Sequence, residues 1–364
     1  MRYILIFLLL AFCSSTQAQD INKEALKLTQ QAIQEMESGK ITLAIEHLKE
    51  AEKMDPGNML YPYEIGYAHY LDKNYGKAID IYKKLKIQIV KGEHQGMVGK
   101  DQVFQMLGNS YDMDGKPKKA IATYDEGIKM LPNSGKLRME RGTMELNKKK
   151  YAEALSYYEQ GIKVDPTFAS NYYRAADIYL KSSEEVWGMI YGEIFMNMER
   201  NTKRTQEMSK MLFDTYKSEI KIESDTNMSI SFSQNSTISM DDLKDGKMKM
   251  PYGIGVYEPT LGMTLIDVNE INIESLNRIR TRFAKLYDEK HKKEYPNVLF
   301  DFHKKLIDLG HFEAYNHWVL IMGAKDEFDE WTKMNPVAWD SFIDWFKTSP
   351  LEINEEKNFH RFQY

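Results

Sequence analysis

Small and large apolar residues recur at a fixed interval through the first half of this chain. Ala44 and Ala78 are 34 residues apart, as are Ala120 and Ala154, and the middle gap of 42 is one period plus eight. The repeating units begin near Ala25, Met59, Asp101 and Gly135. In each unit the eighth residue has a small side chain and the twenty-fourth a large one. These positions hold Ala32, Gly66, Gly108 and Gly142, and Leu48, Tyr82, Tyr124 and Tyr158. This period predicts a helix–turn–helix solenoid, because a small residue lets the two helices of a unit approach closely.

Helix-breaking residues fall where such units need them. Proline stands at the thirty-second position of three units, as Pro56, Pro132 and Pro166, and it ends the second helix there. The turn between the two helices carries Gly39, Asn74 or Gly115, which suit a tight connection.

The third unit contains Leu107-Gly108 followed by Tyr111, and this resembles the Leu-Gly-x-x-Tyr pattern of the tetratricopeptide repeat family. The first helix of a fifth repeat fits at Tyr172, Ala175, Ala176 and Tyr179. The resemblance therefore covers about residues 25–190. It implies a protein or peptide partner bound on the concave face by side chains of the first helices. The candidate partner-binding residues are Tyr63, Tyr67, Tyr70, Gln105, Asn109, Asp112, Met139, Thr143, Tyr173 and Asp177. Lys136 alone does not make the family's clamp for a peptide carboxylate.

Helical periodicity continues after the repeats. Val186, Ile190, Ile194 and Met198 recur every four residues, and a helix is expected to about Ile220 with a break near Asn201. Gly188 and Gly192 would permit close helix packing.

The pattern changes at Glu223 to alternation with a period of two. Met228, Ile230 and Phe232 alternate with serines, followed by Ile238 and Met240 after a polar turn. The alternation returns at Tyr252, Ile254 and Val256, then at Leu261, Met263 and Leu265 after Pro259. Short strands, arranged as two hairpins, are the first interpretation. A disordered linker over 223–247 is the alternative.

The last hundred residues return to a helical period. Apolar residues follow it from Leu276, from Val298 after Pro296, and from Trp339 after Pro336, and Gly310 to Ala314 indicates a degenerate helical hairpin. Trp318, Trp331, Trp339 and Trp345 all lie here. The predicted fold is mainly α: a tetratricopeptide-type solenoid, a small β-containing segment and a helical C-terminal region. The predicted domains are a signal peptide (1–18), a repeat domain with a long capping helix (19–222), a short-strand or linker segment (223–268) and a helical domain (269–364).

The N-terminus indicates export. Met1 and Arg2 precede an apolar run from Tyr3 to Phe12, and a small-residue cleavage site ends at Ala18. A periplasmic or extracellular protein is therefore expected, with no transmembrane span after cleavage. Lipid anchoring at Cys13, the only cysteine, ranks second because Phe12 precedes it. The net charge is −5 with acids and bases mixed, which argues against a nucleic-acid partner.

Motifs of known chemistry are incomplete in this sequence. Asp112 to Gly115 resembles the start of a calcium loop, but Ile121 occupies the position of the bidentate carboxylate. Asp301, His303 and Asp308 are assigned to solvated positions, because His303 points away from the face shared by the two aspartates. We expect no catalytic residues, no metal and no cofactor.

These observations favour an exported, non-catalytic interaction scaffold or adaptor that binds its partner on the concave repeat surface. The alternative is an enzyme, or a binder of a glycan or peptide, with its site in the Trp-rich residues 269–364. Solvent-facing tryptophan rings would favour the alternative, whereas buried rings would remove its main support.

Overall fold

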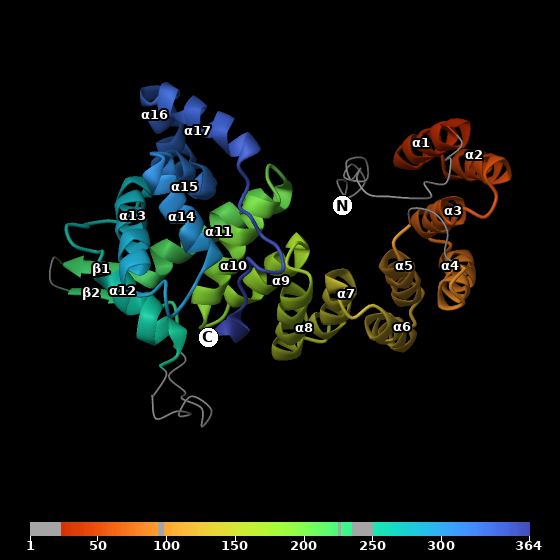
Figure 1. The fold of residues 1–364 in the computed structure, drawn as a ribbon, viewed down its shortest axis with the longest axis horizontal. Coiled ribbons are helices and arrows are strands. Elements are labelled where there is room, and N and C mark those ends of the chain that lie inside the picture. Colours follow the sequence, from red (N-terminus) through yellow and green to blue (C-terminus); the bar gives the residue numbers. More distant parts are fainter. Residues whose placement is uncertain (1–22, 94–97, 225–226, 235–249) are drawn as a thin grey trace. The chain divides into compact units, whose positions relative to one another are not determined.

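The repeat pattern produces a run of helix pairs in the computed structural model (Figure 1). The structure describes residues 23–93, 98–224, 227–234 and 250–364. The pairs are α1 (Lys23–Glu37) with α2 (Ile41–Met54), α3 (Leu60–Leu71) with α4 (Tyr75–Val90), α5 (Lys100–Met113) with α6 (Pro117–Met130), α7 (Gly135–Leu146) with α8 (Tyr151–Val164), and α9 (Ala169–Tyr179) with α10 (Glu185–Met198). The predicted signal peptide, Cys13, Ile238 and Met240 lie outside the described residues.

Contact between the eighth and twenty-fourth positions holds the two helices of each repeat together. A Cβ atom added to Gly66 would lie 2.8 Å from Cζ of Tyr82, and one added to Gly142 would lie 2.6 Å from Cε1 of Tyr158. Tyr82, Tyr124 and Tyr158 are all buried. The predicted register is therefore confirmed, because only a residue without a side chain leaves room for the tyrosine ring.

The turn inside each repeat adopts one backbone conformation. The fifteenth position has positive φ in the first four repeats, at Gly39 (77°), Lys73 (60°), Gly115 (72°) and Lys149 (60°). Glycine accepts this conformation freely, whereas a lysine does so at a cost of about 1 kcal/mol. In the second repeat the residue with positive φ is thus Lys73, the residue before Asn74. The spacing between the second and third repeats exceeds the period by eight residues. A longer α4 and a longer connection to α5 take up these residues.

The helices beyond the repeats follow the sequence closely. The helical path is interrupted at Asn201, which has a φ of 60°, and α11 (Lys203–Glu219) follows. The predicted close approaches are confirmed: a Cβ on Gly188 would lie 2.6 Å from Cγ of Leu180, and one on Gly192 would lie 2.6 Å from Sδ of Met208.

A hairpin is present at the predicted place, but with a partner strand that was not predicted, and the predicted pairing with Ile238 and Met240 lies outside the described residues. Strand β2 (Asn227–Ile230) contains Met228 and Ile230 as expected, and it pairs antiparallel with β1 (Ile220–Ser224), with Ile220 opposite Ile230. Its partner strand thus precedes it in the chain.

The second predicted hairpin is wrong. Residues Gly253–Tyr257 form a π-helical turn that continues into α12 (Glu258–Gly262), where Pro259 stands in the first turn of the helix. Proline suits that position because it needs no amide donor there. The buried residues Val256, Tyr257 and Leu261 are spaced for one face of a helix, so the short alternation in the sequence was ambiguous.

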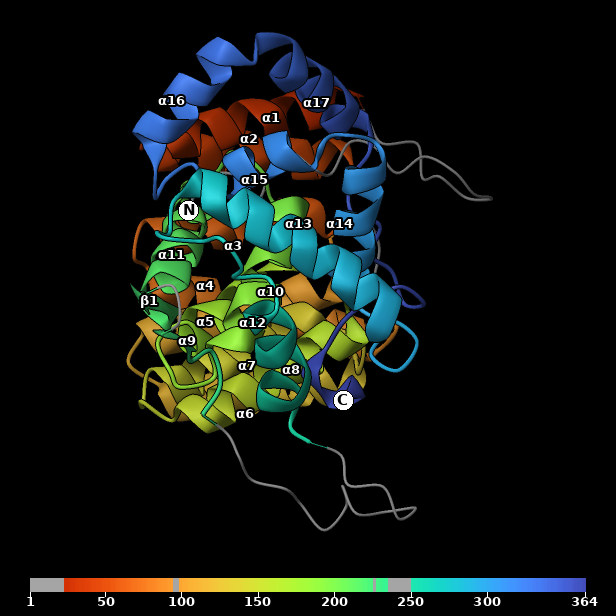
Figure 2. The ribbon, with the colours of Figure 1, turned by 90° about the vertical axis from the view of Figure 1, so that its left-hand side faces the viewer.

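The last hundred residues are helical, as predicted. They form α13 (Ile273–Lys290), α14 (Val298–Asp308), α15 (Phe312–Leu320), α16 (Lys325–Met334) and α17 (Pro336–Thr348), followed by a short 3₁₀ turn (Arg361–Gln363). Helix α13 packs against α14 and α15, and α14 also contacts α10 (Figures 1 and 2). The predicted hairpin after α14 is confirmed, with Gly310 at a φ of 73°.

The described chain divides into two units, one ending at Gly127 and the other beginning at Ile128. The first unit holds the first two repeats and most of the third. The second holds the remaining repeats, the hairpin and helices α11 to α17. In the second unit, the segment after α17 packs back on the repeats, because Arg361 Nε and Nη2 donate to Glu159 at 2.8 and 2.9 Å and Phe359 is fully buried.

Replacing Gly142 with leucine should destabilise the second unit, because the added side chain would meet the Tyr158 ring. Overpacking of this kind costs about 1–3 kcal/mol. The free energy of unfolding can be measured in urea by tryptophan fluorescence, since all five tryptophans belong to the second unit.

Gly262→Leu is the matched control. A Cβ at Gly262 would lie 3.6 Å from Cδ1 of Ile230, an ordinary contact, so a change within about 0.5 kcal/mol is expected. Equal stability of Gly142→Leu and wild type would contradict the repeat register.

Candidate functional site

Three predicted binding residues form a tyrosine stripe along α3: Tyr63, Tyr67 and Tyr70. All three are half-buried. The Tyr67 and Tyr70 rings stack with centroids 6.4 Å apart, and Tyr63 meets the edge of buried Tyr82 at 5.6 Å. Each ring is thus partly fixed by the fold while part of its surface stays accessible. Such rigid aromatic surface is well suited to binding a partner.

Helix α5 carries Gln105, Asn109 and Asp112, which are half-buried too. The Tyr124 hydroxyl donates to Oδ1 of Asn109 at 2.5 Å. The amide of Asn109 is thereby held in one orientation by the second helix of its own repeat. These polar groups belong to the same unit as the tyrosine stripe.

The remaining predicted residues lie in the second unit. Thr143 donates to the Met139 carbonyl at 2.9 Å within α7. On α9, Tyr173 donates to Oε2 of Glu207 at 3.2 Å and its ring lies 5.0 Å from that of Phe195. Asp177 pairs with Lys181 at 2.5 Å. The predicted residues on α9 are therefore engaged by neighbouring side chains of the same unit and, like the stripe on α3, remain half-buried.

The tryptophans of the C-terminal helices form packed clusters. Trp318 is buried, and the other three are half-buried. Trp331 stacks on His317 at 4.1 Å and donates from Nε1 to Glu313 at 2.9 Å. Trp318 is thus removed from solvent, while Trp331, Trp339 and Trp345 pack against neighbouring rings and keep part of their surface accessible.

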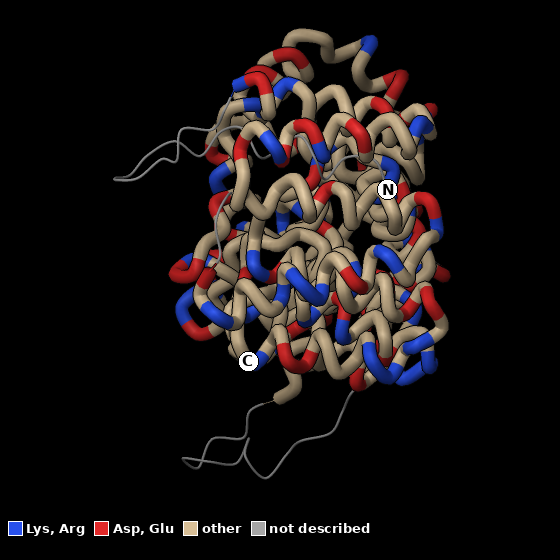
Figure 3. The backbone as a smooth tube through the Cα atoms, turned by 90° about the vertical axis from the view of Figure 1, so that its right-hand side faces the viewer, with Lys and Arg blue, Asp and Glu red and all other residues tan. Residues whose placement is uncertain are grey.

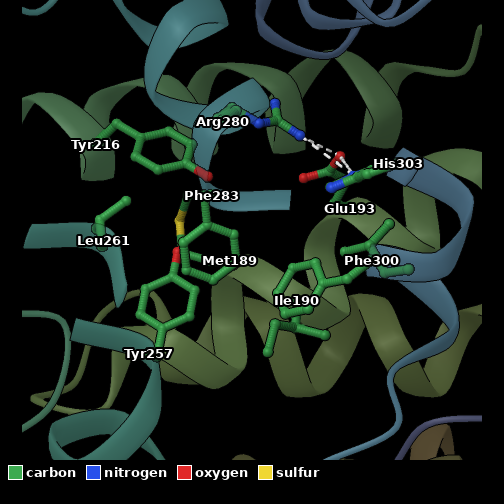
Figure 4. A pocket seen from close by; sticks show the side chains of 11 residues that line it. Met189, Ile190, Glu193, Tyr216, Tyr257, Leu261, Arg280, Phe283, Phe300 and His303 are labelled. Atoms are coloured by element: carbon green, nitrogen blue, oxygen red, sulfur yellow. Dashed lines mark hydrogen bonds and ion pairs between the residues drawn. The ribbon is translucent and has the colours of Figure 1, made fainter. Parts of the chain in front are cut away.

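A buried polar cluster joins four helices of the second unit. Glu193 on α10 pairs with Arg280 on α13, lies 2.6 Å from Nε2 of His303 on α14, and accepts a hydrogen bond from the Tyr315 hydroxyl on α15 at 2.8 Å. The Glu193 carboxylate, the Arg280 guanidinium and the His303 ring point toward one another (Figure 4). Asn197 donates to Tyr315 at 2.7 Å and completes the network.

The electrostatics of this cluster favour a fixed charge pair. Burial alone would raise the pKa of the Glu193 carboxyl, but Arg280 and His303 lower it to about 2. Burial lowers the pKa of His303, so its ring stays neutral and donates from Nε2 to the carboxylate. The adjoining cavity, lined by Tyr216, Tyr257 and these groups, measures about 20 Å³. That volume holds one water molecule and no larger substrate, so the cluster ties helices together.

The assignment of His303 to solvent was wrong. It is buried on the inner face of α14, while Asp301 and Asp308 are exposed as expected. The role of Glu193 was not predicted, because its partner Arg280 is 87 residues away in the sequence. The available signal was a single acid inside the otherwise apolar stretch Val186–Met198, since a charge in a helix that is apolar all round must be buried with a partner.

Comparison with known proteins agrees with the fold of the repeats. Residues 29–90 and 106–180 match the tetratricopeptide repeat family, and this part of the chain belongs to it. Similar solved structures include MamA (18% identity, 46% of this chain and 93% of that one, TM-score 0.33), YrrB, described as having an unusual peptide-binding site (21%, 50% and 91%, 0.31), and PilF of Pseudomonas aeruginosa (17%, 50% and 80%, 0.37). No curated protein matches the sequence.

Acidic and basic residues are interspersed along the backbone (Figure 3). None of the helices in the described part of the chain is both long and apolar enough to cross a membrane.

Replacing Glu193 with glutamine should destabilise the second unit by about 3 kcal/mol or more, because Arg280 would remain buried without its counter-charge. Urea unfolding followed by tryptophan fluorescence measures this directly.

The control is Glu274→Gln, which removes an exposed pair with Arg278 on the surface of α13. It should cost less than about 1 kcal/mol. If both variants lose the same small amount, the buried cluster does not hold the four helices together.

Proposed function

We propose that this chain is an exported interaction scaffold, and that the tyrosine stripe of its first unit binds a segment of a partner protein. The observation that carries the proposal is the state of Tyr63, Tyr67 and Tyr70. They lie on the first helix of a repeat, are held by aromatic contacts, and retain accessible surface. Large, rigid aromatic groups of this kind dominate protein interfaces.

The polar residues of α5 extend the proposed surface. Gln105, Asn109 and Asp112 are half-buried in the same unit, and an amide held by Tyr124 can offer a defined hydrogen bond to a peptide backbone. Aromatic anchors with satisfied polar groups beside them are the usual make-up of a binding surface. Binding of a peptide segment is also known for a similar protein, since YrrB is described as a repeat protein with an unusual peptide-binding site.

Export is the second part of the proposal. It rests on the apolar N-terminal run and the small residues that end at Ala18. The mature protein would then begin near Gln19 and contain no cysteine, because Cys13 is removed.

N-terminal sequencing of the protein purified from its own cells should therefore begin at or near Gln19. A chain that keeps Met1, or that carries a lipid on Cys13, would contradict this cleavage.

Replacing Tyr63 and Tyr67 together with alanine should weaken partner capture by about 1 kcal/mol or more per residue. The measurement is quantitative affinity capture from the native envelope fraction, with the captured protein identified and then titrated against the variant.

Tyr151→Ala is the matched control, because Tyr151 is 53% exposed and lies at the start of a second helix. It should bind as well as wild type. Hydrogen exchange of the α3 amides checks that the double variant is folded, and a folded double variant with full capture would reject the proposal.

A further inference from the structure

One buried glutamate differs from all the others in the described structure. Five glutamates are buried, and four have partners: Glu35 with His47, Glu145 with Arg141, Glu159 with Arg361, and Glu193 with Arg280. Glu64 on α3 is 5% exposed, and no hydrogen bond or ion pair within the described residues reaches its carboxylate. The Glu64 oxygens retain some contact with solvent, but a carboxylate this deeply placed and without a protein partner is costly and calls for an explanation.

The surroundings of Glu64 are aromatic and acidic. After burial itself, the charge of Glu64 helps to raise the pKa of the Tyr63, Tyr67 and Tyr82 hydroxyls, so the carboxylate lies near all three. Asp101 acts on Tyr63 and Glu37 acts on Tyr67 in the same sense. Burial raises the pKa of Glu64 to about 7.

The fold does not require an acid at this position. Glu64 is the sixth residue of its repeat; the sixth residue is Gln30 in the first repeat, Met106, buried and apolar, in the third, and Glu140, half-buried, in the fourth. A side chain of similar length without charge thus fills the corresponding place in the first and third repeats. The charge of Glu64 therefore adds cost without a packing benefit, a pattern typical of residues kept for binding.

We propose that Glu64, together with Tyr63 and Tyr67, is a recognition site for a basic side chain, arginine or lysine, of the partner segment. The inference rests on the proposed function and names the chemistry of the bound segment. A guanidinium or ammonium group can pair with the carboxylate while its flat or methylene surface packs on the tyrosine rings. Binding would supply the counter-charge that the free protein lacks, and the acidic Glu37 and Asp101 would favour the approach of a basic segment.

The direct test uses the full chain and two short blocked peptides, identical except that one carries a central arginine and the other citrulline, which is uncharged. Binding is followed by isothermal titration and by NMR of ¹³C-labelled glutamate carboxyls. The arginine peptide should bind at least about tenfold more tightly than the citrulline peptide, and Glu64→Gln and Glu64→Met should abolish the difference.

Glu50→Gln is the control, because Glu50 is exposed on α2 of the same unit. It should leave the preference for arginine intact. Equal binding of the two peptides, no binding of either, or an unchanged preference in Glu64→Gln would each overturn the inference.

Hydrogen exchange of the α3 amides separates binding from folding. Both Glu64 variants should be at least as well protected as wild type, because they remove a buried charge without a partner. Lost protection in both would show that Glu64 supports the fold, and this would also overturn the inference.

The affinity for the arginine peptide should increase with pH. With a pKa of about 7, Glu64 is mostly ionised at pH 8 and mostly protonated at pH 6. The groups coupled to it are Tyr63 and Tyr67 on α3 and Tyr82 on α4, while Asp101 acts on Tyr63 and Glu37 on Tyr67. Affinity for the arginine peptide should rise about tenfold from pH 6 to pH 8 in wild type and stay flat in Glu64→Gln. A flat wild-type profile contradicts the site.

Capture of the partner distinguishes this inference from the proposed function. If the double tyrosine variant loses the partner while Glu64→Gln retains it, the tyrosine stripe stands and the glutamate site fails. If both variants retain the partner, both proposals fail.

Discussion

The contact between a small residue on the first helix of a repeat and a large side chain on the second, a tyrosine in the second to fourth repeats, is the constraint on which the repeats depend. Gly66 against Tyr82, and Gly142 against Tyr158, leave no room for even one added carbon atom. This contact sets how closely the two helices of a repeat approach. Because α3 is held against α4 in this way on one side, another of its faces can carry Tyr63, Tyr67 and Tyr70 at a fixed spacing.

The second unit depends on buried charge as well as on packing. Glu193, Arg280 and His303 come from three helices far apart in the sequence, and the Glu193 carboxylate pairs with both of the others beside a cavity of about 20 Å³. In the first unit buried Glu35 pairs with His47 in the same way, but Glu64 has no such partner among the described residues. The same physical cost is thus offset within the fold at Glu193 and Glu35 and, on our proposal, by a bound partner at Glu64.

The repeats could be predicted from the sequence because their contacts are local and recur. The period fixed the eighth and twenty-fourth positions, and the prolines after α2, α6 and α8 marked helix ends. The π-helical turn at Gly253 was missed, since a few alternating apolar residues suit a strand and a helix equally. His303 and Glu193 were missed because their pairing joins residues 110 positions apart, and no local pattern encodes such a contact.

The central claim is that the partner lies against the tyrosine stripe of α3. The most direct measurement places a photo-cross-linking amino acid at Tyr70 in one sample and at exposed Tyr151 in another, and irradiates each in the native envelope. The account predicts one partner cross-linked from position 70 and none from position 151. Cross-linking from 151 alone, or equally from both, would contradict it.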